Sequence, residues 1–364
     1  MTDGARLVRD LDRGLSLPSS WYTDPAVVER ERARIFRRSW QYVGRTAQVA
    51  RAGDYFTAVA GDVPVVVARS SEGLGAFVNV GRHRRHEVAS GAGNCKTLQC
   101  PYHAWTYGLD GRLRAAPRSD HEPGFDRDDF PLLPARLDTW GPFVFVNVDP
   151  EASPLADMLG ELPRIIAGSG LDLAGLRFRE RADWEADANW KVLIENFLEC
   201  YHCPVQHPSF SAIVDVDEEA YSLRAYRWFS SQVAPVRRSA LEGQGRRAVY
   251  DAHGAVTQAQ YHFLWPSFTI SINPGQPNLS IDVWLPDGPE RTRGFTDRFF
   301  GAGVPEDYQR EMIAFNKQVS AEDDRLTSSV QRGLRAGLPA QGRFLTKSEH
   351  LVVHFQKLVV EAVG

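Results

Sequence analysis

The first part of the chain consists of short apolar and aromatic runs separated by turn signals. The runs cover residues 55–59, 63–68, 74–80, 97–100, 105–107 and 143–148, and turn-forming segments lie at 60–62, 91–94 and 109–111. Short β-rich runs with such punctuation are typical of an all-β domain. The pattern therefore predicts a small β domain over residues 41–150, which ends at the turn-rich segment that follows Val148.

A different pattern precedes this domain. Residues 1–20 are predicted to be a mobile arm or a segment draped over another surface. From Asp24 to Trp40, apolar residues recur among charged ones, which is the pattern of an amphipathic helix. Asp24 suits the N-cap of such a helix, and Pro25 suits its first turn. We therefore expect residues 1–40 to form an arm and a helix that pack on the C-terminal domain.

The remainder of the chain, residues 151–364, mixes strand-like and helical patterns. Strand-like runs lie near residues 178–184, 222–233, 258–272, 279–285 and 293–300, and helical patterns cover residues 155–162, 305–330 and 348–363. Antiparallel strands followed by helices indicate an α+β fold. The sequence thus predicts a small all-β domain and a larger antiparallel-sheet-and-helix domain.

The segment 189–208 contains the densest group of metal-binding side chains. Its apolar residues recur at helical spacing, which predicts a helix over residues 190–203 with Glu199 and His202 on one face. Pro204 is expected to end that helix, so that the chain folds back and brings His207 beside His202. Two imidazoles and a nearby carboxylate suit a first-row metal such as iron or zinc. The alternative is that both histidines are core residues bonded to the backbone, and spacing alone does not separate the two.

Composition and charge narrow the class of protein. Apolar residues make up 43% of the chain and charged residues 24%, as in soluble globular proteins. The net charge of −4 gives no reason to expect nucleic-acid or membrane binding. No run has the length of a membrane helix, and the charged N-terminus lacks an apolar signal region, so a cytoplasmic location is expected.

The four cysteines lie at positions 95, 100, 200 and 203. They do not belong to a small secreted scaffold, so no structural disulfide is expected. Cys200 and Cys203 flank His202 and are predicted to be buried packing residues.

The β domain carries a second group of possible metal ligands. It contains His83 and, further along, the segment from Cys100 to His103. A Cys-x-x-His pair after a strand is a common metal-binding half-site. Together with a Cys-x-His half-site it would form the Cys₂His₂ ligand set of a Rieske [2Fe–2S] centre. Gly81 stands two residues before His83, where that set requires a thiolate.

These motifs, taken in order, resemble those of the α subunits of Rieske non-haem iron oxygenases of the ring-hydroxylating type. The resemblance is closest to the branch that includes carnitine and glycine-betaine oxygenases. It spans nearly the whole chain, through residues 17–44, 79–84, 100–107, 189–208 and 322–334. The first cluster loop differs from the family pattern at Gly81, whereas the second cluster loop and the mononuclear iron motif match fully.

The resemblance implies a ring-hydroxylating oxygenase fold and a set of metal ligands. His202 and His207 would bind a mononuclear Fe(II), and Asp323 would complete a 2-His-1-carboxylate triad, with Asp324 as the alternative third ligand. Molecular oxygen would bind at the open metal positions beside a small organic substrate.

The resemblance also implies partners. Glu199 would lie between an iron ligand and a cluster histidine of a neighbouring subunit in a trimer, and Asn196 would either help to hold the site or serve a structural role. Electrons would come from a reductase or ferredoxin.

The loss at Gly81 limits what the Rieske-like domain can hold. One iron would keep His83 and His103, while the other would keep Cys100 alone. Cys95 is a candidate replacement, but the five strand residues between it and Cys100 span about 16 Å, which places it at the far end of the hairpin. We therefore expect a defective or absent cluster in a domain kept for its fold and trimer contacts. A labile cluster completed by water or a small thiol is the alternative.

Three functional hypotheses follow. In the first, the iron site hydroxylates, demethylates or otherwise oxidises a small organic substrate, and a related subunit with an intact cluster pairs with this chain and supplies electrons. The expected assembly is a homo- or hetero-trimer. In the second, an iron oxidase works without a Rieske partner, with electrons from a cosubstrate, a direct reductase or the substrate. In the third, zinc or iron acts as a Lewis acid in a hydrolase or lyase. The retained cluster ligands and Glu199 favour the first, and a scaffold without activity is the weakest alternative.

The substrate is constrained by one weak signal. Residues 261–274 are rich in aromatics, whose faces would suit a quaternary ammonium group or an aromatic ring. Because a buried strand needs the same residues, core packing is expected to explain most of them.

Overall fold

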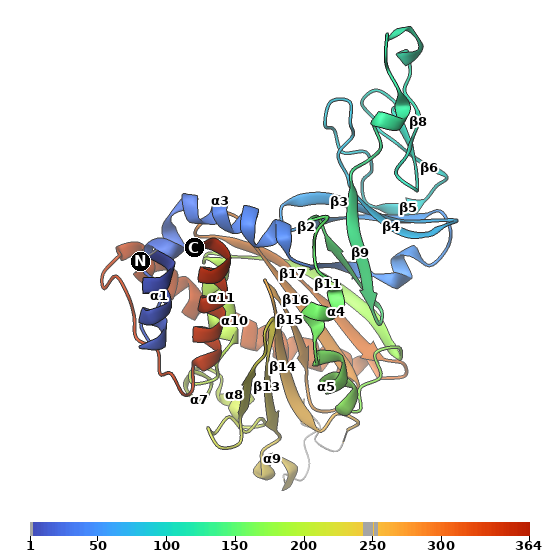
Figure 1. Ribbon diagram of the computed structural model, residues 1–364. Coiled ribbons are helices and arrows are strands. Elements are labelled where there is room, and N and C mark those ends of the chain that lie inside the picture. The colour runs from blue at the N-terminus through green and yellow to red at the C-terminus, as the bar shows by residue number, and fades with distance from the viewer. Residues whose placement is uncertain (1–2, 243–249, 251–253) are drawn as a thin grey trace. The chain divides into compact units, whose positions relative to one another are not determined.

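The structure of the chain is a computed structural model that describes residues 3–242, 250 and 254–364. The chain divides into two compact units, one of Arg32–Asp157 and one of Met1–Glu31 with Met158–Gly364 (Figure 1). The first unit is built mainly of strands, and the second combines an antiparallel sheet with helices. The predicted α+β class is therefore confirmed. Within the described residues, no helix has the length and apolar character needed to cross a membrane.

The unit Arg32–Asp157 contains two antiparallel sheets. A seven-stranded sheet has the order β1-β10-β9-β4-β3-β2-β5, and a three-stranded sheet has the order β6-β7-β8. Its core lies on β3, where four consecutive side chains from Val65 to Ala68 are fully buried. The strands are β1 (Gln41–Arg45), β2 (Asp54–Ala60), β3 (Val63–Ser70), β4 (Gly73–Val78), β5 (Ala92–Asn94), β6 (Thr97–Gln99), β7 (Thr106–Gly108), β8 (Leu113–Ala115), β9 (Pro134–Trp140) and β10 (Phe143–Asn147). Short 3₁₀ turns are η1 (Phe36–Arg38), η2 (Thr46–Val49), η3 (Ser119–His121) and η4 (Arg127–Asp129).

The other unit is organised on a seven-stranded antiparallel sheet of order β11-β17-β16-β15-β14-β13-β12. Its strands are β11 (Leu176–Ala186), β12 (Ser222–Ala225), β13 (Phe229–Pro235), β14 (Gln258–Leu264), β15 (Phe268–Ile272), β16 (Asn278–Pro286) and β17 (Thr292–Gly301). The helices of the chain are α1 (Asp3–Asp12), α2 (Ser20–Thr23), α3 (Pro25–Arg34), α4 (Leu155–Leu159), α5 (Leu162–Gly168), α6 (Trp190–Phe197), α7 (Cys203–Gln206), α8 (Pro208–Ser211), α9 (Arg238–Glu242), α10 (Glu306–Ala336) and α11 (His350–Val363).

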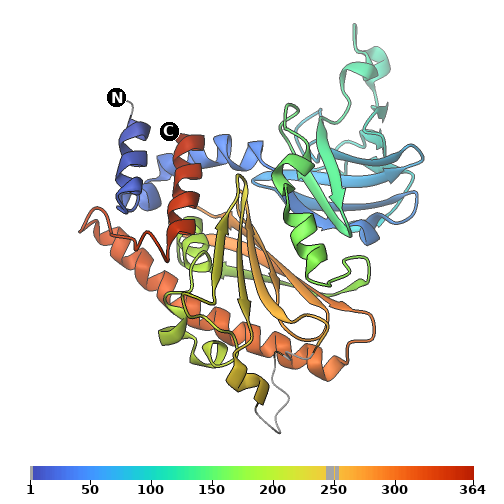
Figure 2. The ribbon, with the colours of Figure 1, turned by 60° about the horizontal axis from the view of Figure 1, so that its bottom comes forward.

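Helices α6 and α11 pack on one face of this sheet through aromatic contacts. The Phe197 ring of α6 meets Trp284 of β16 edge to face at 5.6 Å between centroids, and Phe355 of α11 meets Phe263 of β14 at 5.4 Å. The long helix α10 runs along the unit beside the sheet, as Figure 2 shows. The space between α6, α10 and this face of the sheet is where the candidate site lies.

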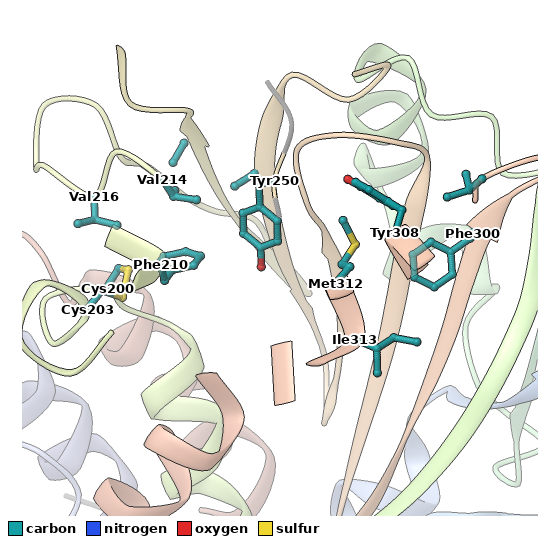
Figure 3. Packing of buried hydrophobic residues seen from close by; sticks show 13 residues of the cluster. Cys200, Cys203, Phe210, Val214, Val216, Tyr250, Phe300, Tyr308, Met312 and Ile313 are labelled. Carbon is teal, nitrogen blue, oxygen red and sulfur yellow. A yellow bond between two sulfur atoms is a disulfide. The ribbon is translucent and has the colours of Figure 1, made fainter. Parts of the chain in front are cut away.

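A cluster of buried apolar residues supports the site from the sheet side of α10. It joins Phe210 of α8 and Tyr250 to Tyr308 and Met312 at the start of α10 (Figure 3). The rings of Phe210 and Tyr250 meet edge to face at 6.4 Å. Because Phe210 of α8 and Met312 of α10 are buried in the same cluster, the cluster holds α8, which follows His207, against α10, which carries Asp323.

The N-terminal segment was expected to be either a mobile arm or a segment draped over another surface, and the first of these is wrong for residues 3–12. Residues 3–12 form the helix α1 rather than a mobile arm, and α1 lies beside α11 (Figures 1 and 2). Burial of Leu7 and Leu11, which are 6% and 1% exposed, stabilises it there. The helix expected over residues 24–40 is shorter and ends at Arg34, although the Asp24 carboxylate does accept a bond from the Ala26 amide at 2.8 Å.

Candidate metal centre

Helix α6 begins at a capped end and is fixed by a buried ion pair. The Asn189 side chain accepts a hydrogen bond from the Lys191 amide at 3.0 Å, which is a standard N-cap. The Lys191 Nζ donates to Glu31 at 2.6 Å, and neither side chain is exposed. Trp190 Nε1 donates to the other Glu31 oxygen at 2.8 Å. These contacts set the position of the helix whose last turn carries Asn196.

The helix ends at Phe197, so the predicted helix over residues 190–203 is wrong in length. In a continuous helix, the Tyr201 amide would donate to the Phe197 carbonyl. Instead, that amide donates to the Glu199 carboxylate, and the Phe197 carbonyl accepts from Gln232 of β13 at 2.6 Å. Glu199 and His202 therefore meet across a turn and not along a helical face.

Pro204 also acts differently from its predicted role. It lies in the first turn of a new short helix, α7, where its missing amide hydrogen costs nothing. His207 follows α7 directly and is 2% exposed. The rings of His202 and His207 lie edge to face with centroids 5.1 Å apart, so the chain does fold back and bring the two imidazoles together.

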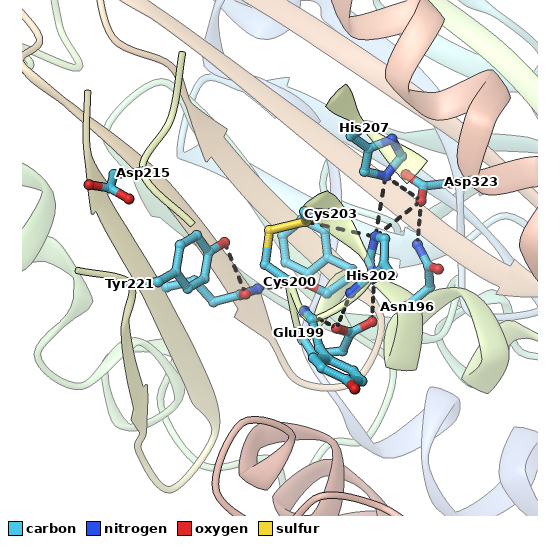
Figure 4. Close-up of a disulfide and its surroundings, with 12 residues drawn as sticks. Asn196, Glu199, Cys200, His202, Cys203, His207, Asp215, Tyr221 and Asp323 are labelled. Atoms are coloured by element: carbon cyan, nitrogen blue, oxygen red, sulfur yellow. Dashed lines mark hydrogen bonds and ion pairs between the residues drawn. A yellow bond between two sulfur atoms is a disulfide. The ribbon is translucent and has the colours of Figure 1, made fainter. Parts of the chain in front are cut away.

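Three ligand atoms converge at one point. His202 Nε2 lies 3.2 Å from His207 Nε2, and Asp323 Oδ1 of α10 lies 3.5 Å and 3.0 Å from these two nitrogens (Figure 4). Ligands about 2.1 Å from a metal and at right angles to one another are separated by about 3 Å. The three side chains therefore fit one face of a metal ion, and they are the one such group found within the described residues.

Each ligand is held from behind by a second polar group. The Nδ1 atom of His202 bonds to Glu199, and the Nδ1 atom of His207 bonds to Glu322 at 2.7 Å. Asn196 Nδ2 donates to Asp323 Oδ1 at 2.8 Å. Carboxylates behind metal-binding imidazoles fix the ring orientation and leave Nε2 free to coordinate.

The charges of the group are strongly coupled. Burial opposes ionisation of Asp323, but hydrogen bonds from His202 and His207 outweigh it and lower the pKa of its carboxyl to about 2. Burial also opposes charging of His202, but Asp323 and Glu199 outweigh it and raise its pKa to about 9. At neutral pH the Asp323 carboxylate is therefore ionised and the His202 imidazole is protonated, and binding of a metal ion would release that proton.

A cavity of about 540 Å³ opens beside the three ligands. Its opposite wall is the sheet face, which contributes Tyr261, Asp282, Trp284 and Arg298. Of the aromatic residues in segment 261–274, Tyr261 lines the cavity, while Phe263, Trp265 and Phe268 are buried residues outside its lining.

Cys200 and Cys203 form a disulfide, which corrects the prediction that the chain has none. Both are 8% exposed or less, as expected for packing residues, and both line the cavity. Figure 4 shows the disulfide beside His202, and Cys203 Sγ lies 3.9 Å from His202 Nε2. Cys200 lies in the turn between α6 and α7 and Cys203 begins α7, and their Cα atoms are 4.9 Å apart.

The Rieske-like unit brings three of the four expected cluster ligands into one region. The rings of His83 and His103 meet edge to face at 4.6 Å, and His83 stacks on Trp105 at 5.1 Å. Cys100 is a buried free thiol. Gly81 offers no ligand atom, so the residues present do not complete a four-ligand site. Cys95 is also a free thiol, and it packs at the margin of the apolar cluster that contains Cys100.

Sequence reasoning missed two polar residues of the site. Glu322 lies in the segment 322–334 that carries part of the family resemblance, but its bond to His207 depends on the rotation of α10. Asp282 lies in β16, whose sequence resembles that of an ordinary core strand. The signal that could have identified it as a cavity residue is an acidic side chain at an inward-facing position of that strand.

The fold and the site together define a Rieske-type oxygenase α subunit. Residues 173–364 match the family described as the ring hydroxylating alpha subunit (catalytic domain), and residues 39–133 match the Rieske [2Fe-2S] domain. The chain belongs to the ring-hydroxylating oxygenase α-subunit family.

Two relatives of known activity match nearly the whole chain. The chain is 33% identical to the carnitine monooxygenase oxygenase subunit of Acinetobacter pittii, covering 96% of this chain and 95% of that one. It is 31% identical to the chloroplastic choline monooxygenase of Spinacia oleracea, covering 93% and 76%. This chain is therefore an oxidoreductase related to oxygenase subunits of multi-component systems.

Solved structures show the same fold. The quaternary ammonium Rieske monooxygenase CntA in complex with the substrate γ-butyrobetaine has a TM-score of 0.83 at 30% identity, with 98% of each chain covered. Naphthalene 1,2-dioxygenase from Rhodococcus has a TM-score of 0.80 at 20% identity, which shows likeness of fold alone.

Proposed function

We propose that this chain is a mononuclear Fe(II) oxygenase that hydroxylates or demethylates a small organic amine, with electrons supplied by a cluster-bearing partner subunit. The convergence of His202, His207 and Asp323 beside a cavity carries the proposal. Two imidazoles and one carboxylate on a single face leave the other positions of an ion open, which is the arrangement of non-haem iron oxygenases.

The metal and the chain have separate tasks in this proposal. A bound iron would supply oxygen activation, and His202, His207 and Asp323 would hold it. The carboxylates of Glu199 and Glu322 keep the two rings oriented, and Asn196 orients Asp323. The cavity wall would place the substrate carbon beside the metal and exclude bulk water.

The proposed electron source follows from Gly81. The Rieske-like domain of this chain has three candidate ligands for a site that needs four, so it is not assigned an electron-transfer step. Glu199 bonds His202, and its side chain is 12% exposed, so a partner's cluster could approach this edge of the site. We infer a hetero-trimer, because only a homologous subunit that differs from this chain at the position of Gly81 can have the full Cys₂His₂ set.

The substrate class is inferred from the relatives and the cavity. Carnitine and choline, named for the relatives, carry quaternary ammonium groups. The aromatic faces of Phe197, Tyr261 and Trp284 on the cavity wall suit such a group. A substituted amine is therefore proposed as the substrate of this chain.

The test is a metal and sulfide analysis of protein purified without oxygen. The proposal expects about one iron per chain and little acid-labile sulfide, and His207→Ala should lose most of the iron. Matched His350→Ala, at a partly exposed histidine that does not line the cavity, should retain it. About one zinc per chain without iron would instead support a hydrolase or lyase, and stoichiometric sulfide would show that the cluster assembles despite Gly81.

Electron supply needs a second measurement. The iron-loaded chain should oxidise a quaternary ammonium substrate only when a cluster-bearing homologue and its reductase are added. Turnover with reductase alone would support an iron oxidase that does not depend on a Rieske partner.

A further inference from the structure

The cavity wall opposite the metal centre carries a carboxylate that the metal centre does not use. Asp282 lies on β16 between Ser280 and Trp284, and these three side chains point to the same face because they alternate along the strand. Thr296 lies directly opposite on β17. Asp282 is thus part of the sheet floor and is separate from the acids of α6 and α10.

Asp282 has a polar neighbour but no ion-pair partner. It accepts a hydrogen bond from Thr296 Oγ1. Among the residues described here, no lysine, arginine or histidine nitrogen lies within the 4.0 Å of an ion pair. Arg298 is near enough to interact with it electrostatically, but its guanidinium bonds Glu180 at 3.2 Å. Burial raises the pKa of the Asp282 carboxyl. A carboxylate enclosed in this way is stabilised by any cation that enters the cavity.

Aromatic rings surround the same part of the wall. Trp284 lies next to Asp282 on the same face of β16 and contacts Phe197 edge to face. Phe197 in turn meets Tyr261 at 6.4 Å. Trp184 of β11 lies so close to the Gly294 backbone that a Cβ there would be 2.3 Å from its ring. The glycine therefore permits the indole to lie against the sheet beside Trp284.

The combination identifies the chemistry of the ligand. An aromatic wall attracts an organic cation through the ring faces, and an enclosed carboxylate adds a full charge. A neutral aromatic hydrocarbon would gain from the rings but would leave the carboxylate without a partner. The wall is therefore suited to an alkylated ammonium group.

We propose that Asp282 is the specificity-determining residue of the cavity, and that its carboxylate anchors the positively charged amine of the substrate opposite the metal centre. This inference rests on the proposed function for the identity of the reaction, but its binding step does not require turnover. Asp282 is a positioning residue here, since it touches the substrate cation and not the reacting carbon.

The test compares a cation with a neutral molecule of the same shape. Choline and 3,3-dimethylbutan-1-ol differ in a nitrogen cation replaced by carbon, and binding of each to the full chain is measured by calorimetry. The wild type should bind choline at least about tenfold more tightly. Asp282→Asn should reduce this preference to about threefold or less while leaving affinity for the alcohol within about twofold.

A matched variant controls for general charge. Glu185→Gln removes an acid from the cavity rim, where Glu185 pairs with Arg291 and its side chain is 69% exposed, so the preference for choline should be unchanged. Iron content of the Asp282→Asn protein should also equal that of the wild type.

Three results would overturn the inference. The first is a wild type that does not prefer choline, including one that binds neither probe. The second is an Asp282→Asn variant that weakens both probes equally, since this indicates a structural role. The third is loss of iron from that variant. Because these outcomes come from binding and metal content, they differ from failure of the proposed oxygenase reaction, which leaves the choline preference intact.

Discussion

The Gly81→Cys substitution should restore the missing ligand of the Rieske-like unit. The backbone at Gly81 does not have a positive φ, so a side chain is not excluded by conformation. A Cβ added there would meet His86 O at 3.3 Å and Val88 Cγ2 at 3.4 Å. Both contacts are tight without being a clash, and the Gly81 amide can keep its 2.9 Å bond to His86 O.

The cost to stability can be estimated from these contacts. Added volume in a packed site costs about 1–3 kcal/mol, while replacing glycine restricts the unfolded chain and returns up to about 1 kcal/mol. The net loss in the free energy of unfolding should be about 3 kcal/mol or less, which corresponds to a fall of up to about 15 °C in melting temperature. The unit should therefore remain folded.

The assay measures cluster content after anaerobic reconstitution with iron and sulfide. The cysteine variant should gain about two irons and two acid-labile sulfides per chain, with the visible absorption of a Rieske centre. Gly81→Ser is the matched control, because it adds the same Cβ with a hydroxyl that does not replace the thiolate. The serine variant should show the stability loss without the sulfide.

Two results would refute this reasoning. Stoichiometric sulfide in the wild type would show that Gly81 is no obstacle, whether Cys95 or a small molecule completes the site. A folded cysteine variant that takes up no more sulfide than the serine variant would show that His83, Cys100 and His103 are not positioned to hold a cluster.

Two further predictions concern the metal centre and its support. Glu322→Gln removes the carboxylate that bonds His207 Nδ1, so iron affinity should fall by about 10–100-fold in a competition titration, and an unchanged affinity would contradict the assigned role. Glu195 bonds Tyr22 and Gln356 at 2.7 Å each, and burial raises its pKa from 4.5 to about 7. Because the protonated form is favoured in the folded state, its contribution to stability is present below pH 4.5 and is lost as the pH rises to 7. Glu195→Gln should therefore match the wild type near pH 4.5 and exceed it by about 1–3 kcal/mol at pH 8 in urea unfolding; equal stability at both pH values would contradict the buried carboxyl.

Local sequence patterns were sufficient for much of the fold. Alternating and aromatic runs identified strands such as β2, β3 and β16, because strand periodicity is set by which side chains a sheet buries. The position at which α6 ends could not be predicted from such patterns. The Gln232 side chain of β13 donates to the Phe197 carbonyl, and the Glu199 carboxylate accepts from the Tyr201 amide. The helix therefore ends at Phe197, although the apolar pattern of the sequence continues beyond it. The tertiary fold brings Gln232 to the end of the helix, and helical spacing places Glu199 on the face of His202 and not at the helix end.

The disulfide was not predicted, for a different reason. A continuous helix over residues 190–203 holds side chains three apart on one face, but redox reasoning from cell compartment weighed against a bond. The Cα atoms of Cys200 and Cys203 lie 4.9 Å apart, which is close to the separation of residues three apart in a helix, so the spacing itself permitted the bond. The general rule on redox compartment excluded it, and that rule does not describe an individual pair of neighbouring cysteines.

The choice between Asp323 and Asp324 shows what decides which carboxylate of a long helix meets the two imidazoles. Successive residues of α10 point about 100° apart, so rotation of the helix selects one of them. Thr327 and Gln331 are 2% and 1% exposed and follow Asp323 at intervals of four, which places Asp323 on the buried stripe and Asp324 beside it. That stripe is polar because Gln331 accepts a bond from the Asn189 amide at 2.9 Å, at the start of the helix that leads to the metal centre. A search for apolar periodicity does not detect a polar stripe of this kind. The bond between Asn189 and Gln331 fixes the rotation of α10 relative to α6, and this rotation brings the Asp323 carboxylate to the two imidazoles.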